Sequence, residues 1–168
     1  WRYSSTPEYE NEKKIQNDKY TRNWNENAIK HLLKKGGGEG LIIHKNHEPI
    51  GYCLLRNLID EVEILSIEII ANYRHMGFGL ALFNQIEGSF EKKKISRCII
   101  EVNKNNILAR GFYEKIGFVC IKTIKNYYKI GNSYQDGLLL QKTYIYHKIK
   151  IINCFILLQK TYQLSIKK

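Results

Sequence analysis

The sequence has little of what marks secreted, membrane-spanning or disulfide-stabilised proteins. Its four cysteines among 168 residues include no C-x-x-C pair, so we expect reduced, mostly buried thiols rather than disulfides. The longest apolar run near the end, IINCFILL, is shorter than the about 20 residues that cross a bilayer. The first residues, WRYSSTPEYENEKK, are polar and lack the apolar stretch of a secretory signal. These absences predict a cytoplasmic protein with no membrane partner.

Motifs for several kinds of chemistry are missing as well. The sequence contains no G-x-x-x-x-G-K-[ST] phosphate loop and no Ser/His/Asp nucleophile elbow. His44 and His47 form an H-x-x-H pair, but no cysteine or third histidine lies at ligand spacing. We therefore expect no metal.

The composition is that of one globular domain with a full core, with 43% hydrophobic and 26% charged residues. More than half of the net charge of +11 comes from residues 141–168, which carry six lysines and no acid. Such a tail could touch RNA, but elsewhere we expect no direct nucleic-acid binding. We predict a poorly patterned segment at 1–23, a folded domain at 24–144, and a basic and apolar tail of unknown role at 145–168.

Apolar periodicity predicts a single-domain mixed α/β fold. A short helix begins near Trp24 and ends at the glycines 36–38. The strands that follow are expected at 41–44, 50–55, 61–70, 97–102, 118–124 and 136–141. The segment 125–135, KNYYKIGNSYQ, is expected to join the last two strands.

Two further helices are predicted between these strands. The first follows a glycine turn, and its apolar side is formed by Leu82, Phe83, Ile86 and Phe90. The second has apolar residues at positions i, i+4 and i+8, which are Leu108, Phe112 and Ile116. Gly117 is placed to end this second helix.

The glycine turn, NYRHMGFGLALF, stands immediately before the first of these two helices. Glycine lets the backbone approach a ligand closely, and a helix start exposes N–H groups that no carbonyl satisfies. The turn at Gly77 and Gly79 could therefore bind a phosphate through its backbone N–H groups. An ordinary tight turn is the alternative.

Five segments follow one another in an order that is characteristic of a known family: DEVEILSIEI, the R-x-x-G-x-G turn, IIEVNKNN, LARGFYEKIGF and KNYYKIGNSYQDGLLL. Together they resemble the GNAT acetyltransferases over residues 24–141. The chain is most similar to the RimI type, which acetylates the N-terminal alanine of a small-subunit ribosomal protein. The resemblance implies a GNAT fold, a mixed central sheet with flanking helices, and direct acetyl transfer from acetyl-CoA to a protein N-terminus.

The resemblance also implies an acetyl-CoA site. The backbone of the splayed strand at Ile67, Glu68 and Ile69 would bind the acetyl and pantetheine parts, and an N–H near Ile69 could polarise the thioester carbonyl. The turn would wrap the pyrophosphate with Arg74, His75, Met76, Gly77, Phe78, Gly79 and Leu80. Because relatives commonly carry arginine at the places of His75 and Leu80, we expect phosphate affinity to rest on the backbone and Arg74. Asn106 would bind CoA or simply cap a helix.

For the chemistry, the resemblance implies that Glu101 is the general base and Tyr113 the general acid, with Tyr113 also near the CoA sulfur. An α-amine, with a pKa of about 7.7–8.0 against about 10.4 for lysine, loses its proton without extreme tuning. Tyr73 is an alternative base. Tyr127, Tyr128 and Tyr134 would cover the acceptor peptide, or only pack.

A second hypothesis is a degenerate, non-catalytic GNAT-fold module that holds CoA or RNA. The polar segment 1–23, where the family has an apolar strand and helix, and the basic tail favour this alternative. The Glu101 and Tyr113 pair favours the enzyme.

Overall fold

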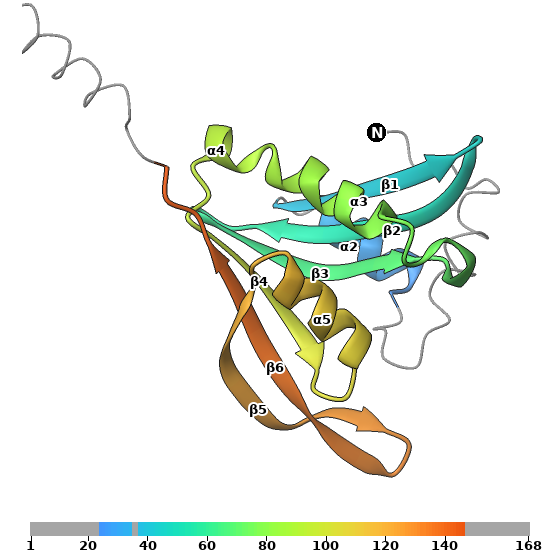
Figure 1. Ribbon diagram of the computed structural model, residues 1–168, viewed down its shortest axis with the longest axis vertical. Coiled ribbons are helices and arrows are strands. Elements are labelled where there is room, and N and C mark those ends of the chain that lie inside the picture. Colours follow the sequence, from blue (N-terminus) through green and yellow to red (C-terminus); the bar gives the residue numbers. More distant parts are fainter. Residues whose placement is uncertain (1–23, 35–36, 147–168) are drawn as a thin grey trace, which may run out of the picture.

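The computed structural model describes residues 24–34 and 37–146, so the predicted segment 1–23 and most of the predicted tail, including Cys154, lie outside the described residues. The described chain forms one six-stranded mixed sheet (Figure 1). Its strands lie in the order β1 (Gly38–Lys45), β2 (Glu48–Asn57), β3 (Glu61–Ile69), β4 (Arg97–Asn103), β6 (Ser133–Thr143) and β5 (Val119–Ile130). Only β3 and β4 pair in parallel; the other neighbouring pairs are antiparallel.

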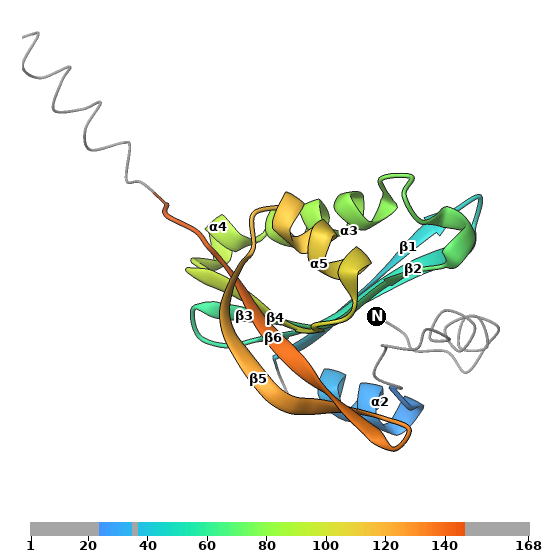
Figure 2. The same ribbon diagram turned by 60° about the horizontal axis from the view of Figure 1, so that its bottom comes forward.

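Helices cover both faces of this sheet. One face carries α3 (Phe78–Glu87), α4 (Phe90–Lys93) and α5 (Ile107–Lys115), and the other carries α2 (Glu26–Lys34) (Figure 2). The larger core lies under the three helices and includes Phe83 and Phe90, while Ile29, Tyr52 and Leu54 form a smaller core under α2. The two faces of the sheet therefore have separate hydrophobic packing.

The first predicted helix and all six strands are present, but two helical details differ from the sequence prediction. The predicted helix through Phe90 ends at Glu87, and Phe90 begins a separate short helix; the four predicted apolar residues are nevertheless all buried. In α5, Phe112 and Ile116 pack on the core as predicted, but the prediction is wrong for Leu108, which is 67% exposed. The residues packed on the core are Ala109, Phe112, Tyr113 and Ile116, an i, i+3, i+4, i+7 stripe beside which Leu108 lies.

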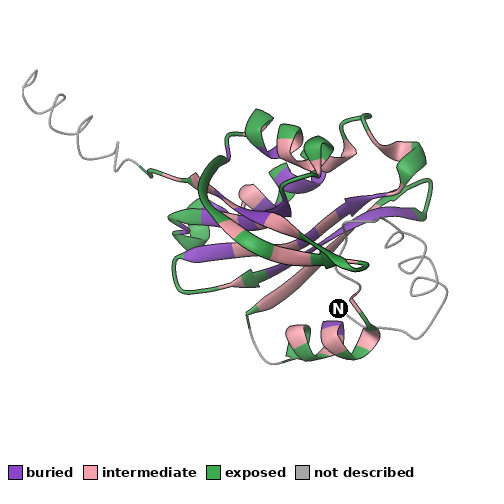
Figure 3. Cartoon of the chain, turned by 90° about the horizontal axis from the view of Figure 1, so that it is seen from below, coloured by how far each residue is buried: buried purple, intermediate pink, exposed green. Residues whose placement is uncertain are grey.

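The last hairpin is longer than predicted. Most of 125–135 is strand rather than connector, because β5 runs to Ile130 and β6 starts at Ser133. Gly131, with φ of 60°, supplies the left-handed conformation that such a two-residue turn requires. Figure 3 shows that β5 is mostly exposed, whereas β2 is mostly buried.

Three cysteines lie within the described residues, and all three are free thiols, with Cys53 and Cys98 buried and Cys120 exposed. Burial raises the pKa of Cys53 well above its usual range and that of Cys98 to about 12. The two buried thiols are therefore protonated at neutral pH. Within residues 24–34 and 37–146 no helix is long and apolar enough to cross a membrane.

Candidate active site

The sheet opens between β3 and β4. These strands pair only from Glu61 to Ile64 on β3 and from Arg97 to Ile100 on β4. The register between β2 and β3 shifts at the same level, between Leu54 and Leu55, where β3 has one extra residue. A pocket of about 110 Å³ begins where the pairing ends, and its lining includes Ser66, Ile67, Glu68, Glu101, Asn103 and Tyr113.

Strand alternation places the lining residues on two different faces. On β4, Ile100 and Val102 pack into the larger core, so Glu101 points to the opposite face, the one that carries α2. On β3, Ile67 and Ile69 contact the larger core in the same way. Tyr113 therefore reaches the pocket from the α5 side and Glu101 from the α2 side.

Tyr113 is held deep beneath α5, with 4% of its surface exposed. Its ring makes edge contacts with Phe112 and Phe118, with centroids 5.3 and 5.5 Å apart. Burial, and then the neighbouring Cys53, raises its pKa well above the usual range. The phenol is consequently neutral at physiological pH and can act as a proton donor.

Glu101 is half-buried and accepts a hydrogen bond from the Tyr127 hydroxyl. Tyr127 packs edge-on against Tyr128, with ring centroids 5.0 Å apart, and Tyr128 lines the pocket. Tyr134 lies near the tip of the hairpin, is 57% exposed and does not line the pocket. The structure thus brings two of the three predicted substrate-binding tyrosines to the candidate site.

Glu68 has a side-chain role that the sequence did not reveal. Tyr52 donates a hydrogen bond of 2.8 Å to Glu68 Oε1, and Ser66 Oγ lies 3.3 Å from the same oxygen. All three residues are buried. Tyr52 lies opposite Glu68 in the β2–β3 register, a pairing that periodicity alone does not specify. The buried Glu68 side chain thus lies on the same face of the sheet as Glu101.

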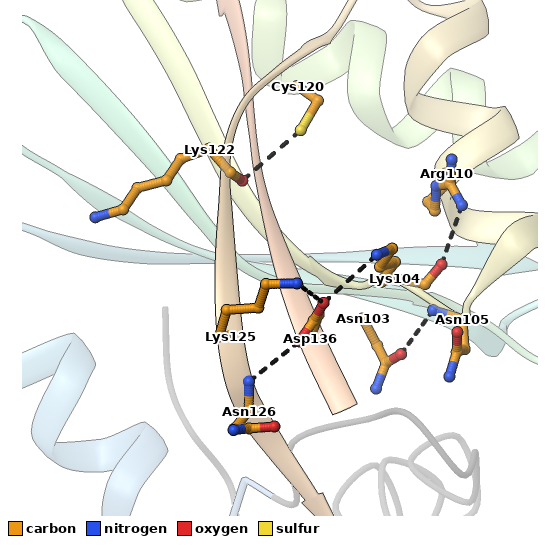
Figure 4. Close-up of polar contacts among 9 residues, drawn as sticks. All are labelled: Asn103, Lys104, Asn105, Arg110, Cys120, Lys122, Lys125, Asn126 and Asp136. Atoms are coloured by element: carbon orange, nitrogen blue, oxygen red, sulfur yellow. Dashed lines mark hydrogen bonds and ion pairs between the residues drawn. The ribbon is translucent and has the colours of Figure 1, made fainter. Parts of the chain in front are cut away.

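Asn103 is a pocket residue that the sequence analysis did not single out. It is 2% exposed and lines the pocket. Its Oδ1 accepts the backbone N–H of Asn105 at 2.8 Å (Figure 4), which orients the amide. Its buried Nδ2 has no hydrogen-bond partner among the described residues. A buried donor of this kind is suited to a ligand carbonyl.

The glycine turn lies between the short 3-10 helix η1 (Ala71–Tyr73) and α3. His75 and Gly77 both have left-handed φ, 61° and 86°, and Gly77 precedes α3 without a side-chain cap. A Cβ at Gly77 would meet no atom within 4 Å, so the backbone there is open to a ligand. A Cβ at Gly79 would instead contact the Phe112 ring at 3.6 Å, so Gly79 faces the protein interior.

Several predicted CoA ligands have contacts within the protein. Arg74 Nε donates to the Ile69 carbonyl at 2.8 Å and ties the turn to the end of β3. Asn106 caps α5 by accepting the Ala109 N–H at 3.1 Å, and it also lines the pocket, so both hypotheses for it are compatible. His75, Met76 and Leu80 are exposed around the turn.

The alternative sites are less favourable. Tyr73 packs edge-on against Phe78, with Lys45 Nζ 5.0 Å from its ring centroid, and it does not line the pocket. His44 and His47 are exposed at the β1–β2 turn. Among the residues that the structure describes, no group of three or more His, Cys, Asp or Glu side chains is arranged to hold a metal ion.

A splayed mixed sheet with an acidic and a phenolic group at the opening is typical of acyl-CoA-dependent N-acyltransferases, and the sequence profile of the "Acetyltransferase (GNAT) family" matches residues 3–118. Because this match spans well over half of the chain, the protein belongs to the GNAT acetyltransferase family. The predicted family, fold and enzyme class are thereby confirmed.

The relatives are more specific. The [ribosomal protein bS18]-alanine N-acetyltransferase of Haemophilus influenzae is 29% identical over 116 residues, covering 67% of this chain and 79% of the relative. The crystal structure of the ribosomal-protein-S18-alanine N-acetyltransferase from Escherichia coli superimposes with a TM-score of 0.75 at 19% identity, covering 88% and 94% of the two chains. A GNAT family acetyltransferase from Elizabethkingia anophelis with acetyl-CoA bound gives 0.61 at 21% identity, covering 71% and 84%.

Proposed function

We propose that this protein transfers the acetyl group of acetyl-CoA to the N-terminal α-amine of a protein, by direct attack in the pocket between β3 and β4. The observation that carries this proposal is the meeting of two groups there, the Glu101 carboxylate from β4 and the neutral Tyr113 phenol from α5. They enter from opposite faces of the sheet, so an acyl donor and an acceptor can approach the same point from two sides.

The two faces suggest which substrate binds where. The turn at Gly77 and the N-terminus of α3 lie on the face with α3 and α5, where backbone N–H groups can hold the phosphates of acetyl-CoA. Beyond Ile64 the strand β3 is not paired with β4, which leaves room for the pantetheine arm. Glu101, Asn103 and Tyr127 then face the acceptor from the α2 side.

The reacting groups have complementary tasks. Acetyl-CoA supplies an acetyl thioester when it is bound. Glu101, directly or through a water molecule, takes the proton that the amine loses as its nitrogen bonds to the acetyl carbon. Tyr113 gives its proton to the departing sulfur as the carbon–sulfur bond breaks. Asn103 Nδ2 is placed to donate to a carbonyl of the acceptor peptide.

The acceptor is assigned by relationship. The H. influenzae relative is named as an N-acetyltransferase of an alanine of ribosomal protein bS18, and we propose the N-terminus of a small-subunit ribosomal protein as the acceptor here too. This places the reaction in the cytoplasm, where ribosomal proteins are made. The carboxyl oxygens of Glu68 and Glu101 on the acceptor face can accept hydrogen bonds from the N–H groups of a peptide N-terminus.

Mass spectrometry of peptides incubated with the protein and acetyl-CoA tests the proposal. We expect acetylation of a free α-amine on an alanine-first peptide with the bS18 N-terminal sequence. The same peptide with a blocked α-amine and a free lysine should react far more slowly, since fewer lysine amines are neutral at pH 7. Binding of acetyl-CoA without transfer to any peptide in a panel of first residues would favour the non-catalytic alternative.

A separate prediction concerns acetyl-CoA binding at the glycine turn. Replacing Gly77 by alanine should lower acetyl-CoA affinity by about tenfold or more, because the new Cβ projects into the open space at the turn. Gly131→Ala is the matched control, since Gly131 also has positive φ and an open surrounding, but lies at the hairpin tip. Calorimetric titration with acetyl-CoA measures both. Equal losses in the two variants, or none in Gly77→Ala, would contradict a phosphate seat at the turn.

A further inference from the structure

Tyr127 and Glu101 come from strands that are not neighbours. Glu101 lies on β4 and Tyr127 on β5, and β6 lies between these strands in the sheet. Adjacent strands are about 4.8 Å apart, so the two backbones are separated by about 10 Å at this point. The Tyr127 side chain has to pass over β6 for its hydroxyl to reach the Glu101 carboxylate.

The tyrosine ring passes over Gly137 of β6. A Cβ on Gly137 would lie 2.9 Å from Tyr127 Cδ1, closer than real Cβ atoms come to other atoms, and 3.2 Å from both Tyr127 Cβ and Cγ, which is also unusually tight. Gly137 pairs with Asn103 on one side and Ile124 on the other, so it marks the crossing from β5 to β4. The φ of Gly137 does not lie in the left-handed region, so the backbone conformation does not require glycine. What requires glycine is the space that the Tyr127 ring occupies.

A bulge in β5 turns Tyr127 toward this crossing. The register passes from Ile124 opposite Gly137 to Tyr128 opposite Gln135, so three residues of β5 face the single residue Asp136 of β6. Asn126, in the middle of the three, has a left-handed φ of 53°. The bulge interrupts the usual alternation, and both Tyr127 and Tyr128 approach the candidate site.

Asp136 holds the bulge in place (Figure 4). Its Oδ1 accepts the backbone N–H of Asn126 at 3.2 Å, and its Oδ2 accepts Lys125 Nζ at 3.2 Å. Lys104 Nζ, in the loop after β4, is 3.4 Å from the same Oδ2. The Asn126 N–H and then Lys125 lower the pKa of Asp136, so it is charged at neutral pH. One carboxylate thus links the strand of Glu101 with the strand of Tyr127.

We propose that Asp136 and Gly137 are positioning residues for acetyl transfer: Asp136 holds the β5 bulge and Gly137 leaves the space through which Tyr127 fixes the Glu101 carboxylate. This inference rests on the proposed function, in which Glu101 removes the proton of the acceptor amine. Fixing the carboxylate matters because a misplacement of about 1 Å at a reacting group can cost about 10²-fold in rate.

Steady-state kinetics of four variants with an N-terminal peptide test the proposal. Tyr127→Phe, Gly137→Ala and Asp136→Asn should each lower kcat, the first two by about tenfold or more, while KM for acetyl-CoA stays unchanged. The double variant combines Tyr127→Phe with Gly137→Ala. Its kcat should be less than about twofold below that of Tyr127→Phe alone, because the hydrogen bond that Gly137→Ala disturbs is already absent.

Two matched variants control for general effects. Gly40→Ala adds a methyl to another strand glycine, with its nearest contact the end of the Leu54 side chain at 3.4 Å. Asp60→Asn removes one surface charge at the start of β3, where Asp60 accepts a hydrogen bond from Ser96. Both should leave kcat within about twofold, as surface or loosely packed changes usually do. Circular dichroism and thermal melts check that each variant is folded.

The outcomes separate this inference from the proposed function. If Gly137→Ala does not fold, Tyr127→Phe and Asp136→Asn still test the positioning role, since neither adds an atom to the crowded crossing. Unchanged kcat in folded Tyr127→Phe, or fully additive losses in the double variant, would overturn the inference. If Glu101→Gln lowers kcat while these variants do not, the proposed function stands without it. If Glu101→Gln has no effect, the base assignment itself fails.

Discussion

Glu101→Gln should lower the rate of acetyl transfer by about 10²- to 10⁴-fold, the usual contribution of a general base. Glutamine keeps the size of the side chain and can still accept the hydrogen bond from Tyr127. It cannot take the proton that the amine loses. The measurement is the single-turnover rate with saturating acetyl-CoA and an alanine-first peptide.

The pH dependence identifies the cause of this loss. The deficit of Glu101→Gln should shrink as pH rises through about 7.7–8.0, because a growing share of the α-amine is already neutral. Acetyl-CoA affinity should not change with the substitution, since Glu101 faces the opposite side of the sheet from the α3 turn. Glu114→Gln, an exposed position on α5, is the control for loss of one carboxylate. A deficit independent of pH would indicate that Glu101 orients the amine rather than accepting its proton.

Tyr113→Phe should also lower the rate by about 10²- to 10⁴-fold, because the departing sulfur loses its proton donor. The phenylalanine ring keeps the edge contacts with Phe112 and Phe118, so the fold should be retained. In the wild type, burial keeps the pKa of Tyr113 well above its usual value. The wild-type rate should therefore show no alkaline decline from this group below about pH 10.

A control with the same chemical change is available at the other end of the sheet. Tyr144 packs edge-on against Phe90, with ring centroids 5.2 Å apart, and Tyr144→Phe removes a hydroxyl away from the pocket. Its transfer rate should match the wild type. If Tyr113→Phe retains full activity while Glu101→Gln does not, the leaving thiolate takes its proton from water or from another group.

Within residues 24–34 and 37–146, several elements could be predicted from short stretches of sequence. The helix ending before Gly37, the six strands and the helix start after Gly77 follow from apolar periodicity and glycine placement, which depend on neighbours a few residues apart. The order of motifs predicts the GNAT family, and the match of residues 3–118 to that family confirms it. The resemblance carried by these motifs implies Glu101 and Tyr113 as the acid–base pair, and both line the pocket at the splay.

Other features depend on pairing between distant residues. Local spacing placed Phe112 and Ile116 correctly on the buried side of α5 but also put Leu108 there. The exact position of the buried stripe, which includes Ala109 and Tyr113 instead, is set by how the helix lies on the sheet. The Glu68 contact with Tyr52 requires the β2–β3 register, and the buried Asn103 amide requires the β4–β6 pairing beside it.

Local sequence determined the number and type of most strands and helices and the place of the glycine turn, because each depends on the conformational preferences of a few consecutive residues. Glu101 and Tyr113 were indicated by the ordered motifs that resemble the family. The tertiary structure decided that β6 inserts between β4 and β5, and so that Tyr127 reaches Glu101 across Gly137. A glycine or an aspartate in a strand has no visible task in the sequence. The roles proposed for Gly137 and Asp136 become apparent only in the sheet, where the strand order, the register and the β5 bulge bring β4, β5 and β6 together around the Glu101 carboxylate.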